Sequence, residues 1–418
     1  MNVLNKRVVG AVLLSCVAAT AFSGAAWADV VTDWNATAQA VLVAKNHQGP
    51  PGYAFVHVAM YDAVNAIDGR YSVFAARPAS SVPWASQEAA AATAAYQVLK
   101  SAYEDQDAAV LAPAYAASLA AIPDGPAKTK GIEIGEDVAA AWLALRAGDG
   151  REAVVPYLFQ PAAPGVYQRT PPAFPNALAP WLAVMRPFAM TRPSQFRAPG
   201  PPDLTSDLYA KDVAFTQALG AANSTERTAE ETEIARFYTE SPTTFFSHNL
   251  RDFAAAKNLG VTGNARLFAQ VFVTAADSMI ACWDSKYYYN FWRPVTAITT
   301  DLDDGNPATA RDPAWTPLAV TPPHPEYPAG HGCVSTGYAE ALKHFFGKPH
   351  LAVTLTSSVP GTVPHVFDNT NKMIDEIILA RVAGGMHFQT SIEDGATIGK
   401  KVGQWVARNH FRPVGTRR

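Results

Sequence analysis

Helical periodicity constrains the fold of this 418-residue chain more than any other feature of its sequence. Apolar residues at intervals of three and four, with many alanines among them, are typical of helices that pack one face against a core. Alternation typical of strands is nearly absent. We therefore predict an all-α protein built as a helical bundle. The predicted helices are Tyr53–Asn65, Gln87–Tyr103, Ala108–Ala121, Gly131–Ala147, Glu226–Thr239, Ala265–Tyr289, Ser335–Phe346, Asn371–Ala383 and Ile392–Arg408.

One proline-rich segment, about residues 150–204, interrupts the helical pattern. Prolines recur among Phe, Tyr and Trp residues, most densely in Val154–Pro202. Proline is excluded from helix interiors, and so many aromatic side chains are atypical of a disordered linker. We expect an ordered loop that wraps over the helical body and forms one wall of the mouth of the site.

The N-terminus has the pattern of a secretory signal peptide. Lys6 and Arg7 precede an apolar run, Val8–Phe22, and Ala26-Trp27-Ala28 supplies small residues for cleavage after Ala28. The alternative is an uncleaved anchor, for which the run is short. We expect residues 1–28 to be removed, no later stretch to be long and apolar enough to span a bilayer, and a secreted or periplasmic protein without integral membrane association.

Residues 29–418 then form a helical domain of 390 residues, long enough to bury a large core as one unit or two. Without Lys6 and Arg7 its net charge is −5, against −3 for the whole chain. This mild acidity argues against nucleic acid as a partner. Cys282 and Cys333 remain after cleavage, and either a disulfide or two buried thiols is compatible with their number.

A first chemical motif, Lys286-x6-Arg293-Pro294, ends the longest predicted helix. Seven residues make about two helical turns, so both cations are expected on one face, with Pro294 ending the helix. Such spacing also arises by chance on exposed helices. The surrounding aromatic residues predict instead that the two cations are partly buried and need an anion.

A second motif is Pro328-Ala329-Gly330-His331, in a proline-stiffened loop before a helix expected to begin near Gly332 or Cys333. A glycine there can bring its N–H and the positive end of the helix dipole against an anion. Taken alone, the motif favours an ordinary first-turn residue for His331 and a solvent-facing loop histidine for His324.

A third motif is Arg381-x5-His387. Six residues of continuous helix would put the two side chains on different faces, but Gly384-Gly385 can break the helix and turn His387 back toward Arg381. The alternative is an ordinary helix end with a cation in its last turn. Together the three motifs provide three cations, one glycine N–H and two histidines, which predicts a pocket for an oxyanion.

The motifs, which lie within residues 283–387, resemble those of the superfamily of vanadium-dependent haloperoxidases and type 2 phosphatidic acid phosphatases. The pattern in that superfamily is Lys-x6-Arg-Pro, Pro-Ser-Gly-His and Ser-Arg-x5-His-x3-Asp, in this order. The helix Val56–Ala66 and the segment His324–His331 are similar to its secreted haloperoxidase-like branch. Three positions depart from the pattern, because Ala329 and Ala380 replace serines and Ser391 replaces the final aspartate.

The resemblance implies the helical-bundle fold of that superfamily and vanadate as cofactor. Lys286, Arg293, Arg381 and the Gly330 N–H would hold the vanadate oxygens, and His387 would bond the vanadium through a ring nitrogen. His331 would act as acid and base. Hydrogen peroxide, a halide and an unidentified organic substrate would be the partners, with Lys286 polarising the bound peroxide.

Two alternatives use the same residues. In a secreted acid phosphatase, His387 would be the nucleophile and His331 the general acid. A non-catalytic oxyanion-binding protein would need the cations but has little use for two histidines. Trp283 and His324 match positions that flank the halide site in the family, which favours the haloperoxidase. The aspartate missing at Ser391 removes an expected support for Arg381 and His387.

Overall fold

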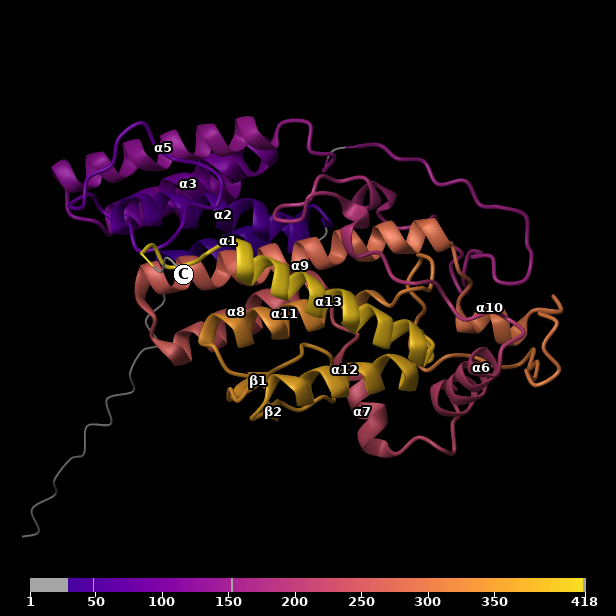
Figure 1. Cartoon of the computed structure of the whole chain (residues 1–418). Coiled ribbons are helices and arrows are strands. Elements are labelled where there is room, and N and C mark those ends of the chain that lie inside the picture. The colour runs from indigo at the N-terminus through magenta and orange to yellow at the C-terminus, as the bar shows by residue number, and fades with distance from the viewer. Residues whose placement is uncertain (1–28, 48, 152, 416–418) are drawn as a thin grey trace, which may run out of the picture.

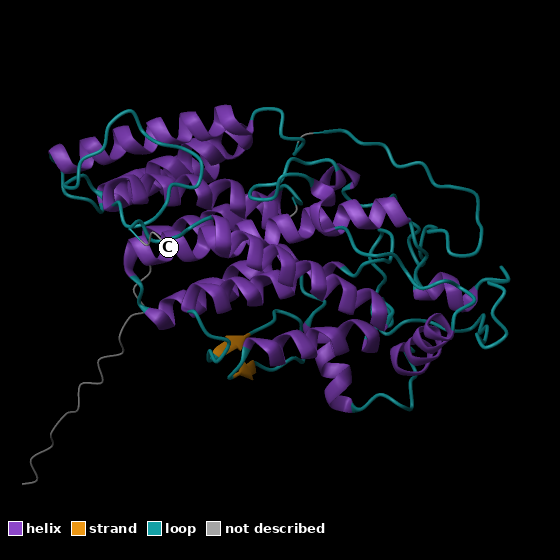
Figure 2. Ribbon diagram, in the orientation of Figure 1, coloured by secondary structure: helices purple, strands orange, loops and turns teal. Residues whose placement is uncertain are grey.

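The protein is described here by a computed structural model covering residues 29–47, 49–151 and 153–415, so the predicted signal peptide lies outside the described residues. The architecture is all-α apart from one short antiparallel hairpin (Figure 1, Figure 2). The helices and strands are α1 (Val30–Ala44), α2 (Gly49–Asp68), α3 (Gln87–Ala102), α4 (Ala112–Ala120), α5 (Pro126–Arg146), α6 (Asp207–Gly220), α7 (Ala229–Phe237), α8 (Pro242–Lys257), α9 (Gly260–Tyr289), α10 (Pro294–Thr299), α11 (Gly330–Phe346), β1 (Val353–Leu355), β2 (His365–Phe367), α12 (Thr370–Ala383) and α13 (Gln389–Asn409).

All nine predicted helices are present, which confirms the all-α prediction, but α1, α6, α8 and α10 were not predicted. Helices α1 and α8 carry polar residues where the fold buries them. Asn35 of α1 bonds His57 and Ser247, and Asn249 of α8 bonds the carbonyls of Phe245 and Thr356. These buried amides interrupt the apolar stripe that sequence periodicity detects.

Helix α9 runs through the centre of the molecule. It packs against α2 on one side and against α11 and α13 on the other, so the N-terminal helices and the C-terminal helices share it (Figure 1). Within the described residues, α9 is long and apolar enough by composition to cross a membrane, so the prediction that no later stretch would meet this description is wrong. Burial of 94% of its most apolar window accounts for its composition.

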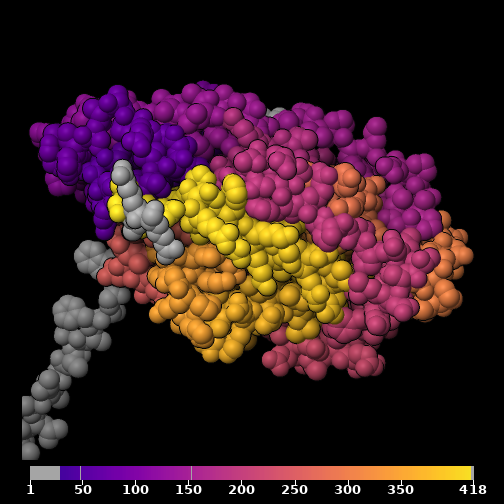
Figure 3. Space-filling view, in the orientation of Figure 1, coloured from indigo at the N-terminus to yellow at the C-terminus, as the bar shows by residue number. Residues whose placement is uncertain are grey.

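Helices α11 and α13 approach each other through glycines. A β-carbon on Gly395 would lie 2.6 Å from the Ala329 carbonyl oxygen, and one on Gly399 would lie 2.5 Å from the Cys333 oxygen. The start of α11 is therefore held directly against the backbone of α13. In the space-filling view, C-terminal residues including α13 form a yellow band across one face of the molecule (Figure 3).

The proline-rich segment contains two short 3₁₀ turns, Pro180–Ala183 and Pro193–Phe196, and no α-helix in its described part. It is tied to α9 at several places. The buried Asp277 carboxylate accepts the N–H groups of residues 188–190, and the Leu178 carbonyl accepts hydrogen bonds from Trp283 Nε1 and Tyr287 Oη. These bonds bring Leu178 to the wall of the cavity described below.

Candidate active site

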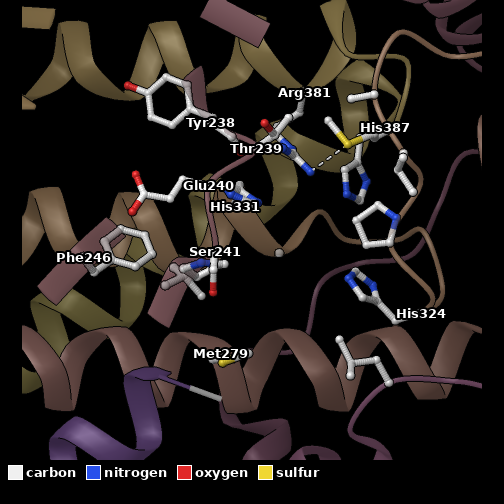
Figure 4. A pocket seen from close by; sticks show the side chains of 18 of the residues that line it. Tyr238, Thr239, Glu240, Ser241, Phe246, Met279, His324, His331, Arg381 and His387 are labelled. Atoms are coloured by element: carbon white, nitrogen blue, oxygen red, sulfur yellow. Dashed lines mark hydrogen bonds between the residues drawn. The ribbon is translucent and has the colours of Figure 1, made fainter. Parts of the chain in front are cut away.

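A cavity of about 510 Å³ brings together residues from the second and third motifs (Figure 4). His331 and Gly330 reach it from the start of α11, and Arg381 and His387 from the end of α12 and the turn that follows. Its remaining lining residues are Pro50, Leu178, Arg236, Tyr238, Thr239, Glu240, Ser241, Pro242, Phe246, Met279, Trp283, Leu318, Ala319, Val320, Pro322, His324, Val334 and Met386.

The first motif does not have the predicted geometry. Helix α9 ends at Tyr289, because Asn290 adopts a left-handed conformation (φ 52°) and its N–H bonds the Lys286 carbonyl. Arg293 lies beyond the helix in an extended conformation, and Pro294 begins α10. The prediction that both cations project from one helical face, with Pro294 ending that helix, is therefore wrong. Proline is well suited to a first helical turn, where its missing N–H is not needed.

Lys286 and Arg293 lie behind the cavity wall, both with 0% exposure. The Lys286 ammonium donates to the carbonyls of Pro325 and Glu326, each at 2.9 Å. Two of its three N–H groups are thus used, and burial lowers the pKa of Lys286 to about 8. The lysine therefore clamps the loop before α11 while keeping one donor.

Arg293 joins that loop to the third motif. Its Nε and Nη2 donate to the carbonyls of His324 and Pro322, and Nη2 also lies 3.0 Å from His324 Nδ1. Its Nη1 donates to the Met386 carbonyl and to His387 Nε2. All five N–H groups of the guanidinium are engaged. Binding of an anion by Arg293 must therefore replace one of these contacts.

The second motif forms the N-terminus of α11. The helix begins at Gly330, two residues earlier than the first predicted start, with Ala329 as its N-cap. The Ala329 methyl group supplies no capping bond, so the first-turn N–H groups lack the side-chain acceptor that a serine would provide. Burial, with Arg381 and Lys286 nearby, holds the pKa of His331 well below its usual range.

The third motif confirms the predicted helix break. Helix α12 ends at Ala383, and Gly385 has a positive φ of 73°, which brings His387 back beside Arg381. Arg381 donates through Nη1 to the Tyr238 carbonyl and through Nη2 to Met386 Sδ (Figure 4). Its buried Nε has no hydrogen-bond partner. Arg381, which lines the cavity, thus keeps one N–H group without a partner.

A buried glutamate that the sequence analysis assigned no role supports His387. Glu326 Oε1 lies 2.8 Å from His387 Nδ1 and accepts the Phe388 N–H at 3.1 Å. Burial raises the pKa of Glu326 to about 7, opposed by Arg293 and Lys286. The two cations and the Phe388 N–H favour the ionised form of this group. Glu326 therefore gives His387 the hydrogen-bond partner that was expected to be missing because Ser391 replaces an aspartate.

The two residues expected near a halide lie side by side on the cavity wall. The ring centroids of Trp283 and His324 are 5.0 Å apart. His324 is only 6% exposed and contacts Arg293, so it is not a solvent-facing loop residue. Cys282 and Cys333 are both buried and unpaired in this structure, in agreement with the alternative of two thiols.

The residues present fit a tetrahedral oxyanion such as vanadate. The unpartnered Arg381 Nε, the uncapped start of α11 and the spare Lys286 N–H are donors, and their positive charge suits an anion. His387 Nε2 offers a lone pair on the same wall, because its present contact is with a donor.

The chain is similar to vanadium-dependent haloperoxidases in part of its sequence and in its fold. Residues 266–415 match the family model of the VCPO second helical-bundle domain. The chain is 27% identical over 262 residues to a vanadium chloroperoxidase of Curvularia inaequalis, a match covering 51% of this chain and 42% of that protein. The chain thus matches less than half the length of this curated relative.

Solved structures share the fold. A bacterial vanadium-dependent iodoperoxidase superposes with a TM-score of 0.72 and 23% identity over 93% of this chain and 98% of its own. An apo bacterial vanadium-dependent chloroperoxidase gives a TM-score of 0.65 and 18% identity over 85% and 91%. The chain therefore has the fold of bacterial vanadium-dependent haloperoxidases, and its C-terminal part is similar to the VCPO second helical-bundle domain.

Proposed function

We propose that this protein is a vanadium-dependent haloperoxidase that oxidises a halide with hydrogen peroxide. The observation that carries the proposal is the convergence of His331, Arg381 and His387 on one cavity, beside the uncapped start of α11. Vanadate would be held by Lys286, Arg293, Arg381, the Gly330 N–H and His387, and when bound it supplies activation of the peroxide toward halide.

The chain's own residues have separable tasks in this proposal. His387 presents the Nε2 lone pair, because its Nδ1 faces the Glu326 carboxylate. His331 lines the cavity and would accept a proton from incoming hydrogen peroxide and donate it to the oxygen that leaves as water. Lys286 and Arg381 supply positive charge to the oxygens that become negative.

The rest of the cavity suits an organic acceptor. Beyond the anion end its walls are largely apolar, formed by Phe246, Met279, Leu318, Val334 and other residues. Its volume is within the range of pockets that bind small organic molecules. Trp283 and His324 line the same cavity beside the cations, with Lys286 Nζ 5.8 Å from the centroid of the Trp283 ring and Arg293 in contact with His324, where a halide approaching the peroxide would bind.

An acid phosphatase is the second candidate. Phosphate and vanadate share charge and shape, and a neutral His387 with Nε2 available is also what a phosphoryl acceptor needs. His331 would then protonate the leaving alkoxide. We rank this second because Trp283 and His324 line the cavity at positions that match the halide site of the family, and an oxyanion-binding protein without turnover ranks third.

The test is a pair of assays on the purified protein after incubation with orthovanadate. We expect bromide halogenation with peroxide to appear, hydrolysis of a phosphate ester to be absent, and excess phosphate to suppress the halogenation by competing for the same cations. Halogenation that ignores phosphate, or that requires haem or a divalent metal, would contradict the proposal.

We also propose that the mature protein is secreted or periplasmic. The support is the signal-peptide pattern in residues 1–28. N-terminal sequencing of protein recovered from the exported fraction of cells should give Asp29 as the first residue, and an intact N-terminus there would contradict cleavage.

A further inference from the structure

Glu326 connects the loop before α11 to the third motif, although it is not part of the cavity lining. Its backbone carbonyl accepts from Lys286, and its carboxylate reaches His387 and the N–H of Phe388, the N-cap of α13. The side chain is 0% exposed. The backbone of Glu326 is thus held by Lys286, and its Oε1 contacts both His387 and Phe388, while its Oε2 has no hydrogen-bond partner.

The hydrogen bonds of His387 define its tautomer. A guanidinium only donates, so His387 Nε2, 3.0 Å from Arg293 Nη1, must be the acceptor nitrogen. A neutral imidazole then carries its hydrogen on Nδ1 and donates it to Glu326. Burial, together with Arg293, Lys286 and Arg381, holds the pKa of His387 well below its usual range, in agreement with a neutral ring.

Anion binding leaves Glu326 as the main constraint on this ring. If Nε2 bonds an oxyanion, the Arg293 contact to Nε2 is lost, and the Nδ1–H bond to the carboxylate remains. We propose that Glu326 is a positioning residue that fixes the tautomer and orientation of His387 for oxyanion binding. The role in oxyanion binding rests on the proposed function, whereas the contact between Glu326 and His387 is independent of it.

The first readout needs no anion. In ¹⁵N-histidine-labelled protein, the signal that disappears in His387→Gln identifies the ring, and its Nδ1 proton should be strongly downfield because it is bonded to a carboxylate. Glu326→Ala should abolish this shift and Glu326→Gln should reduce it. An unchanged signal in either variant overturns the proposal, and the glutamine variant decides if the alanine variant does not fold.

The second readout is orthovanadate affinity by calorimetry. Glu326→Ala should weaken binding by about 10- to 100-fold, as expected for loss of a partner that orients a ligand histidine. Glu326→Gln should weaken it less, because the amide oxygen can still accept from Nδ1 and Phe388. Equal losses in the two variants would contradict a positioning role.

Glu340 provides a matched control. It is a 2% exposed glutamate of α11 whose partners are Lys343 and His344, away from the cavity. Glu340→Gln should leave both the His387 signal and the vanadate affinity unchanged, and a comparable loss there would show that any buried glutamate has this effect. A wild-type protein that binds no vanadate would contradict the proposed function, whereas the proton signal would still test Glu326.

Discussion

A single methyl group on Gly395 should move the start of α11 and weaken oxyanion binding. In Gly395→Ala the new β-carbon would lie 2.6 Å from the Ala329 oxygen, whereas carbon contacts are optimal at about 3.5 Å, so the backbone must separate by roughly 1 Å. Overpacking of this kind costs about 1–3 kcal/mol, and better helix propensity returns about 0.5–1 kcal/mol. We expect a net loss of stability of up to about 2.5 kcal/mol.

The affinity effect follows from the position of the methyl group. Ala329 precedes Gly330, so the displacement is passed to the N–H groups at the helix start. Weakening one charge-assisted hydrogen bond by about 1.4 kcal/mol reduces vanadate affinity about tenfold. Urea denaturation measures the first quantity and calorimetric titration with orthovanadate the second.

Gly135 of α5 allows the two effects to be separated. A β-carbon there would also lie 2.6 Å from a carbonyl oxygen, that of Ala90 in α3, and no residue of α3 or α5 lines the cavity. Gly135→Ala should therefore lose similar stability while binding vanadate like the wild type. If Gly395→Ala also kept full affinity, the start of α11 would not be held in place by α13 and the reasoning would fail.

Three further predictions concern histidines. His387→Ala should abolish vanadate binding, whereas His331→Ala should keep it and slow turnover roughly 10²- to 10⁴-fold, measured by titration and bromide kinetics; equal turnover in both would refute the assigned roles. His324→Ala should impair halide oxidation with vanadate affinity nearly intact, which an unchanged bromide dependence would contradict. Burial lowers the pKa of His365, but hydrogen bonds to its two glutamates raise it above 6.5 overall, so its contribution to stability is full below pH 6.5 and lost above the raised pKa. His365→Gln should cost about 2 kcal/mol at about pH 5.5 and less at about pH 9 in urea denaturation, and an equal cost at both would be contrary evidence.

The helices could be predicted because apolar periodicity is a local property of the sequence. The approach of the second motif to the third could be predicted because it depends on a local helix break. Gly384-Gly385 is a strong helix-breaking signal, and the structure uses it to return His387 toward Arg381. The end of α9 could not be predicted in the same way. Asn290 takes a left-handed conformation that asparagine tolerates without requiring it, so Pro294 was the more visible signal.

The hydrogen-bond partners of the buried cations also could not be predicted from the sequence. The aromatic setting of Lys286 and Arg293 indicated burial, but which carbonyls they meet depends on how the loop of residues 322–326 folds back on them. Glu326 was overlooked for a related reason. Its partner His387 is 61 residues away, and no local pattern marks a carboxylate that replaces a missing aspartate across such a separation.

The two ends of the cavity should differ in how many substitutions they tolerate. The anion end depends on helix termini pressed together with backbone contacts, so most changes there disturb several elements at once. The opposite walls are supplied largely by connecting segments, through Leu178 of the proline-rich segment, the turn before α8 and the loop at Leu318–Pro322. Substitutions in these segments can reshape the space for an acceptor molecule without moving α11. Homologues with this arrangement are expected to diversify in acceptor preference while retaining the same anion chemistry.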